Sequence, residues 1–90
     1  MIIKYDSKSD AIYIAFQKNY FEKEILKTIQ CEFCANSPII NVDIDMDNKI
    51  VGIEIIGAKS HLPKDILENS TEYTTEELNF AMNKIKKLGW

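Results

Sequence analysis

Acidic residues alternate along one stretch of the chain, at Asp43, Asp45 and Asp47, and Glu54 follows them. An EF-hand calcium loop begins with the same D-x-D-x-D spacing and needs Gly at its sixth position and a bidentate Glu at its twelfth. Counted from Asp43, Glu54 is the twelfth residue, but Asn48 stands at the sixth, and the flanking runs have the pattern of strands. We interpret the stretch as an acidic strand face with a turn. A divalent cation at Asp43, Asp45 and Glu54 is the alternative.

Cys31 and Cys34 form an isolated C-x-x-C pair. A structural zinc site needs four ligands, and the chain adds only His61 as a further nitrogen or sulfur ligand. Two chains could pool their cysteines in an oligomer. A redox pair would open a helix, whereas Ala-Asn-Ser-Pro follows here. We interpret the two cysteines as thiols in a loop, with a shared metal site and redox chemistry as alternatives.

The residue inventory does not predict an enzyme. His61 is the single histidine, and no nucleophile motif surrounds it. Acid–base catalysis by histidine needs a second group within hydrogen-bond reach. The sequence also lacks a phosphate-binding glycine loop, an H-E-x-x-H motif and a nucleophile elbow. We therefore expect neither a catalytic residue nor a cofactor, and interpret His61 as a loop residue.

Composition places the chain among ordinary globular domains. It has 90 residues, 46% of them hydrophobic and 28% charged, with a net charge of −3. Nucleic-acid binding needs a concentrated basic surface, and the only short basic run (Lys84, Lys86, Lys87) sits where a helix would end and favour its dipole. No apolar stretch approaches the roughly 18 residues of a membrane span. We expect a cytoplasmic protein that binds neither nucleic acid nor membrane.

The first half of the chain predicts three strands, at residues 2–5, 11–17 and 22–30. The second strand is apolar on both faces, because Ile12, Ile14 and Phe16 alternate with Ala11, Tyr13 and Ala15. A strand with one wet face would alternate with polar residues. Both faces are therefore expected to be covered, either within the chain or by a partner.

Residues 39–57 predict a β-hairpin. With Asp47 and Asn48 in a two-residue turn, the apolar residues of the two strands face one another in three core-directed pairs: Ile44 with Val51, Val42 with Ile53, and Ile40 with Ile55. Such cross-strand pairs fix the register, since a slip of one residue would turn the apolar set to the other face.

The last third of the chain has helical patterns. Pro63 suits a first helical turn before residues 64–69, and Thr74 and Glu77 form a capping box. Apolar residues at helical spacing follow: Leu78, Ala81, Met82, Ile85 and Leu88.

We predict one α+β domain over residues 1–90. An antiparallel sheet of about five strands fills residues 1–60, and a helical segment, residues 61–90, includes an amphipathic helix packed on one face of the sheet.

Two stretches resemble a family of small prokaryotic proteins called domain of unknown function 2283. Residues 5–14 match its Tyr-Asp, polar turn, Asp-Ala and hydrophobic strand, and residues 41–55 match its acidic hairpin ending in Val-Gly-Ile-Glu-Ile. The resemblance covers roughly residues 1–60 and implies a compact sheet domain from bacteria or their phages. It supplies no activity and no catalytic residues. Members are often encoded beside toxin-like genes, so the resemblance implies an antitoxin-like or inhibitory role.

We therefore predict a non-enzymatic protein-binding module, with self-association as a homodimer or a protein partner. The residues expected to bind the partner are Ala11, Tyr13 and Ala15 on the second strand and Asp43, Asp45 and Glu54 on the hairpin. In the alternative arrangement, the segment around Phe21, or the short helix near Ile66 and Leu67, folds over the Tyr13 side. A metal-binding protein, using the three carboxylates or Cys31 and Cys34 pooled in an oligomer, is the competing function.

Overall fold

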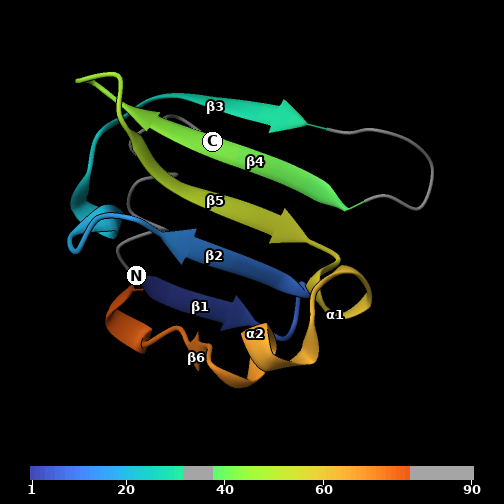
Figure 1. Ribbon diagram of the computed structural model, residues 1–90. Helices are drawn as coiled ribbons and strands as arrows, with labels where there is room; N and C mark the ends of the chain where they lie inside the picture. Colours follow the sequence, from blue (N-terminus) through green and yellow to red (C-terminus); the bar gives the residue numbers. More distant parts are fainter. Residues whose placement is uncertain (32–37, 78–90) are drawn as a thin grey trace.

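A computed structural model shows the chain as one mixed sheet with short helices, and it describes residues 1–31 and 38–77. The six strands lie side by side in the order β3-β4-β5-β2-β1-β6 (Figure 1). The strands are β1 (Ile2–Asp6), β2 (Ala11–Ala15), β3 (Ile25–Cys31), β4 (Ile39–Asp45), β5 (Ile50–Ile56) and β6 (Thr71–Glu72). The helices are η1 (Tyr20–Glu22), α1 (Ala58–His61) and α2 (Lys64–Glu68). The predicted α+β class is confirmed.

The sheet contains one strand more than predicted. β6 pairs in parallel with β1, through Lys4 with Thr71 and Tyr5 with Glu72, whereas the other pairings are antiparallel. Two exposed polar residues carry no apolar alternation, so no pattern in the sequence could predict this strand. The sheet was predicted to lie within residues 1–60, and β6 extends it to a segment beyond residue 60.

The hairpin of β4 and β5 is confirmed, but its turn is one residue longer than predicted. The Asp45 N–H donates to the Lys49 carbonyl at 2.9 Å, and the Asn48 N–H donates to the Asp45 carbonyl at 3.0 Å. Asn48 has a φ of 64°. This is a three-residue loop with its last residue in the left-handed region. The register therefore shifts near the turn: Ile44 pairs with Ile50, while Val51 bulges.

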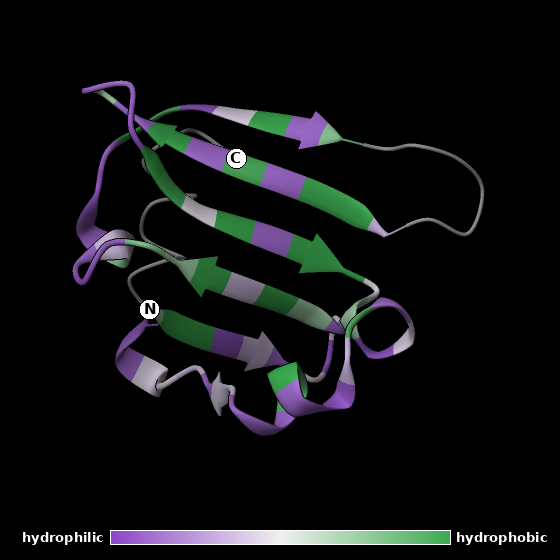
Figure 2. Cartoon of the chain, in the orientation of Figure 1, coloured by the Kyte–Doolittle hydropathy of each residue, from purple (hydrophilic) through white to green (hydrophobic). Residues whose placement is uncertain are grey.

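Farther from the turn the predicted register holds, with Val42 opposite Ile53 and Ile40 opposite Ile55. Hydrophobic and hydrophilic residues alternate along β4 (Figure 2). β3 begins later than predicted, at Ile25, because η1 occupies the residues before it.

The helical segments follow their local signals. Pro63 precedes α2 as predicted, and α1 and α2 lie at the end of the sheet where β1 ends and β2 begins (Figure 1). The Gly57 and Ala58 N–H groups both donate to the Asp10 carbonyl, which fastens the start of α1 there. The capping box is present, since the Thr74 N–H donates to Glu77 and the Glu77 N–H donates to the Thr74 hydroxyl. The amphipathic stretch that follows, residues 78–88, lies outside the described residues.

Candidate functional site

Cross-strand register divides the sheet into two faces of opposite character. On one side, two rows of neighbouring residues run across five strands. The first row is Ile3, Ile14, Ile53, Val42 and Ile29; the second is Tyr5, Ile12, Ile55, Ile40 and Cys31. A third row contains Ile50, Ile44 and Lys27. Phe16 lies beside this row and continues the alternation of β2. We call these residues the isoleucine face.

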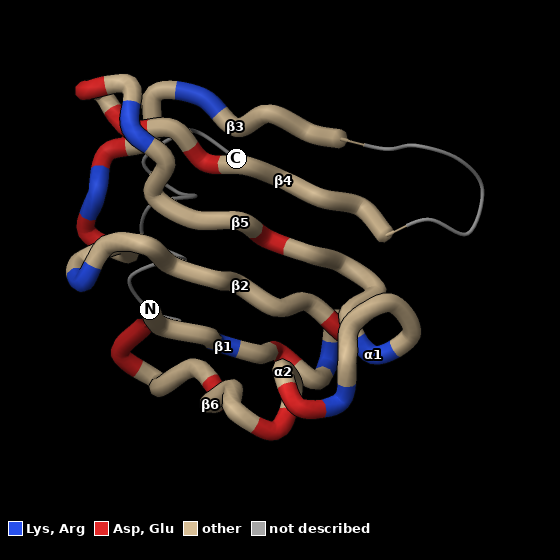
Figure 3. Tube along the Cα trace, viewed as in Figure 1, with Lys and Arg blue, Asp and Glu red and all other residues tan. Residues whose placement is uncertain are grey.

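The isoleucine face is apolar and accessible to solvent. Phe16 is 52% exposed, Ile50 48% and Ile29 45%, and most of the other members are half-buried. Ile12 and Ile44 are buried. Among the residues of this face Lys27 alone carries a charge, and Figure 3 shows how few charged positions lie within β2 to β5. Large exposed apolar patches on a protein surface mark interaction sites.

The opposite side, which we call the polar face, holds a hydrogen-bonded network. Its rows are Lys4, Tyr13, Glu54, Asn41 and Gln30, and Ile2, Ala15, Gly52, Asp43 and Thr28. The Tyr13 hydroxyl donates to Asp43 at 2.8 Å, and the Thr28 hydroxyl donates to the other oxygen of that carboxylate at 2.6 Å. Asn41 donates to Glu54 at 2.8 Å.

Around β2 the polar face is covered by the chain itself, whereas a partner was expected on this side of the strand. Tyr20 stacks on Tyr13 with ring centroids 5.3 Å apart, and Phe21 packs edge-on against Tyr20. Together with the bulged Val51 they bury Ala15, which is 1% exposed, and Ala11 is also buried. The alternative in which the segment around Phe21 folds over the Tyr13 side is therefore the one observed. Ala11 and Ala15 are buried within the single chain.

Glu77 ties three distant parts of the chain together beside this face. Its carboxylate accepts a hydrogen bond from the Tyr20 hydroxyl at 2.8 Å and lies 3.0 Å from Lys4 Nζ. Partial burial opposes ionisation, but the bonds from Thr74, Tyr20 and Lys4 outweigh it and lower the pKa of Glu77 to about 2. The strand β1, the helix η1 and the capping box are thus joined through one carboxylate.

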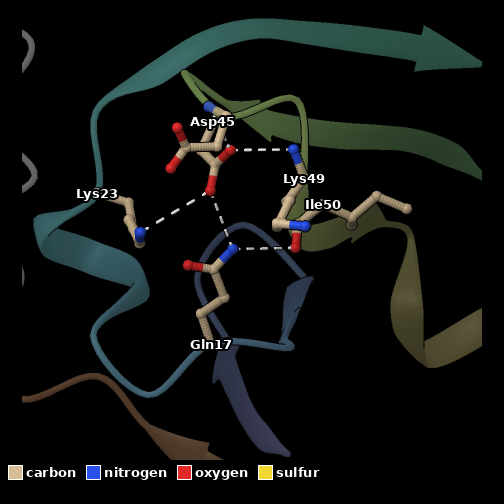
Figure 4. A network of polar contacts seen from close by, with 6 residues as sticks. Gln17, Lys23, Asp45, Lys49 and Ile50 are labelled. Atoms are coloured by element: carbon tan, nitrogen blue, oxygen red, sulfur yellow. Dashed lines mark hydrogen bonds and ion pairs between the residues drawn. The ribbon is translucent and has the colours of Figure 1, made fainter.

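Asp45 organises the hairpin turn (Figure 4). One carboxylate oxygen accepts the N–H groups of Asp47 and Lys49, at 2.9 and 3.0 Å. The other accepts the Gln17 amide at 3.2 Å and lies 3.8 Å from Lys23 Nζ. These contacts, the Lys49 N–H first among them, hold the pKa of Asp45 below its ordinary value. The residue is 3% exposed, and its carboxylate is a structural acceptor at the turn.

The three carboxylates considered as metal ligands are engaged separately. Asp43 is held by Tyr13 and Thr28, Asp45 by the turn, and Glu54 by Asn41. Among residues 1–31 and 38–77 there is no group of three or more His, Cys, Asp or Glu side chains that could hold a metal ion. Cys31 is a free thiol on the isoleucine face, and Cys34 lies outside the described residues.

Burial of Tyr13, Tyr20 and Tyr73 predicts a loss of stability at high pH. Burial, reinforced by Asp43, raises the pKa of Tyr13 far above its ordinary value, and burial with the Glu77 bond does the same for Tyr20. Burial and the charge of Glu54 raise the pKa of Tyr73 to about 12. Stability that depends on protonated tyrosine is complete below pH 10 and is lost as the pH rises above it.

We therefore expect the free energy of unfolding in urea to fall steeply above about pH 10. The fall should be shallower in Tyr13→Phe, which removes one of the titrating groups. Titration of the tyrosines near pH 10 in the folded protein, seen as tyrosinate absorbance without unfolding, would contradict this expectation.

The two sequence signatures have structural roles. In the first, the Tyr5 hydroxyl donates to Asp10 at 2.7 Å, and Asp6 accepts bonds from Lys8 and Ser9 in the turn between β1 and β2. In the second, Gly52 lies under the Tyr13 ring and Asp43 receives its hydroxyl. The sequence interpretation missed this cluster, although a glycine inside a strand can mark a close approach by a neighbour.

Fold and surface together define a small sheet domain with a polar face that the chain covers around β2 and an apolar face that is partly accessible to solvent. A family model described as protein of unknown function (DUF2283) matches residues 2–59, and the chain belongs to this family. No match was found among curated proteins or among solved structures. In the described part of the chain, no helix is both long and apolar enough to cross a membrane.

Proposed function

We propose that the protein is a non-enzymatic protein-binding module and that the isoleucine face is its binding surface. One observation carries the proposal: apolar side chains lie in rows across five strands with a single charge among them, and three of the large ones, Phe16, Ile29 and Ile50, are about half exposed. The central parts of protein interfaces are depleted of charged residues in the same way. Burial of exposed isoleucine and phenylalanine side chains against a partner removes apolar surface from water, which stabilises the complex.

The polar face supports this assignment by contrast. Its carboxylates already have hydrogen-bond partners within the chain, and no buried side-chain oxygen or nitrogen in the described residues is left unsatisfied. A ligand there would have to replace bonds that already exist. The expected partner-binding role of Asp43, Asp45 and Glu54 is thus less favoured than contact through the isoleucine face.

Two adjacent residues of β3 offer a matched test. Ile29 and Gln30 are both exposed, but they point to opposite faces. We expect Ile29→Lys to abolish binding to a protein partner and Gln30→Lys, with the same change in charge, to preserve it. A lysine introduced into an apolar interface must lose hydration without gaining a counter-charge.

The measurement is quantitative affinity purification from the native host with wild-type protein and both variants. Binding of each enriched partner is then measured with purified components. A partner that binds wild type and Gln30→Lys but not Ile29→Lys supports the proposal. If every partner binds both variants equally well, the isoleucine face is not the binding surface. A toxin-like enzyme that the protein inhibits is the first partner to test, because of the antitoxin-like role implied by the family resemblance.

A further inference from the structure

The isoleucine face has the size and composition of one half of a sheet-on-sheet interface. Domains are built from at least two packed layers around an apolar core. Here the core cluster of Ala15, Tyr20 and Val51 lies on the polar side of the sheet. In the described residues the rows of the other side remain accessible, with Phe16, Ile29 and Ile50 about half exposed. A second apolar layer placed on this side would complete a sandwich.

From these observations we propose that a second copy of the chain occupies the isoleucine face, giving a symmetric homodimer in which the two sheets pack face to face. This inference rests on the proposed function and names the partner of the same surface. In a twofold dimer each face contacts its own duplicate. Rows of isoleucine and valine with similar side-chain lengths present the same relief to one another and can interdigitate, as the inner faces of β-sandwiches do.

The dimensions of the isoleucine face are close to the lower limit for a specific dimer. Five strands spaced about 4.8 Å apart, each rising about 3.3 Å per residue, give a face roughly 20 Å by 20 Å. Two such faces in contact cover roughly 800 Å² of flat area. The relief of the side chains brings the buried surface to about 1,000 Å², near the lower limit for a specific interface.

Charge also selects this face over the other surfaces. The chain carries a net charge of −3, so two copies repel one another unless their acidic groups are kept apart. The polar face and the hairpin turn hold Asp43, Asp45 and Glu54, whereas the isoleucine face holds only Lys27, on the outer strand β3. Contact through the isoleucine face therefore brings fewer like charges together than contact through the polar face or the hairpin turn would.

Sedimentation equilibrium of the full-length protein over a range of concentrations tests this proposal. We expect a mass close to twice the 10.4 kDa of one chain. Ile29→Lys and Phe16→Lys should each weaken the dimer by at least about tenfold, and Gln30→Lys should leave it unchanged. Because both mutated side chains are about half exposed in a single chain, the variants should remain folded, which circular dichroism and urea unfolding would check.

A monomeric wild-type protein would overturn the dimer, as would a dimer that survives both substitutions on the isoleucine face. Neither result decides the proposed function. If the wild-type protein is monomeric but binds another protein, and Ile29→Lys abolishes that binding, the isoleucine face is still a binding surface and its partner is that other protein. A monomer with no face-dependent partner refutes both.

Discussion

Replacing Gly52 by alanine should destabilise the protein by about 3 kcal/mol, at the upper end of the cost of overpacking a core. A Cβ at this position would lie 2.5 Å from Cε2 of Tyr13 and 2.6 Å from its Cζ and hydroxyl oxygen. The ring cannot swing aside without cost, because its hydroxyl donates to Asp43 and its face stacks on Tyr20. Urea unfolding of wild type and Gly52→Ala measures the effect.

A double-mutant cycle shows whether the cost comes from the Tyr13 ring. Tyr13→Leu removes the three atoms that a Cβ at position 52 would meet, so in that background Gly52→Ala should cost less than about 1 kcal/mol. The difference between the two backgrounds is the coupling energy. If the cost is the same in both, the effect arises from the backbone at Gly52, and the proposed contact with Tyr13 is not its cause.

The second large effect is expected at low pH, through Glu77. Its pKa in the folded protein is about 2, below its ordinary value of 4.5. A carboxylate whose pKa is lowered by folding contributes stability above the unfolded-state pKa, and this contribution is lost as the pH falls through the folded-state value. Between about pH 4.5 and pH 2 the protein should lose on the order of 1–2 kcal/mol from this group, allowing for screening by solvent.

Glu77→Gln isolates this contribution. It keeps the shape of the side chain but removes the titrating group, so stability should be lower at neutral pH and change less between about pH 4.5 and pH 2. Glu76→Gln is the matched control, because Glu76 is the exposed neighbour. Urea unfolding at several pH values provides the comparison. Equal pH dependence in the two variants would show that the bonds of Glu77 to Lys4 and Tyr20 do not stabilise the fold.

Features that depend on local sequence were predictable. Alternation placed β1, β2 and the β4–β5 hairpin, Pro63 marked the start of α2, and the Thr74–Glu77 capping box has the expected bonds. The family was also identified from its two signatures. Each of these depends on residues close together in the chain, where steric and hydrogen-bonding preferences act directly.

Features that depend on tertiary contacts were not predictable. Both faces of β2 are apolar, so the sequence could not decide which one the chain covers, and Tyr20 covers the side with Ala15. The extra turn residue was missed because Asn48 tolerates a positive φ in a two-residue or a three-residue turn. The bonds of Asp43 to Tyr13 and of Glu77 to Lys4 link distant residues that no spacing rule relates.

The outer strand of the sheet has a consequence for aggregation. In the described residues β3 pairs with β4 on one side only, and such an edge offers unpaired backbone groups to other strands. Here a bulge between Ile25 and Lys27 interrupts the edge, and the lysine itself opposes the addition of another strand. The chain can therefore expose isoleucines on one face of the sheet while its β3 edge resists growth into fibrils.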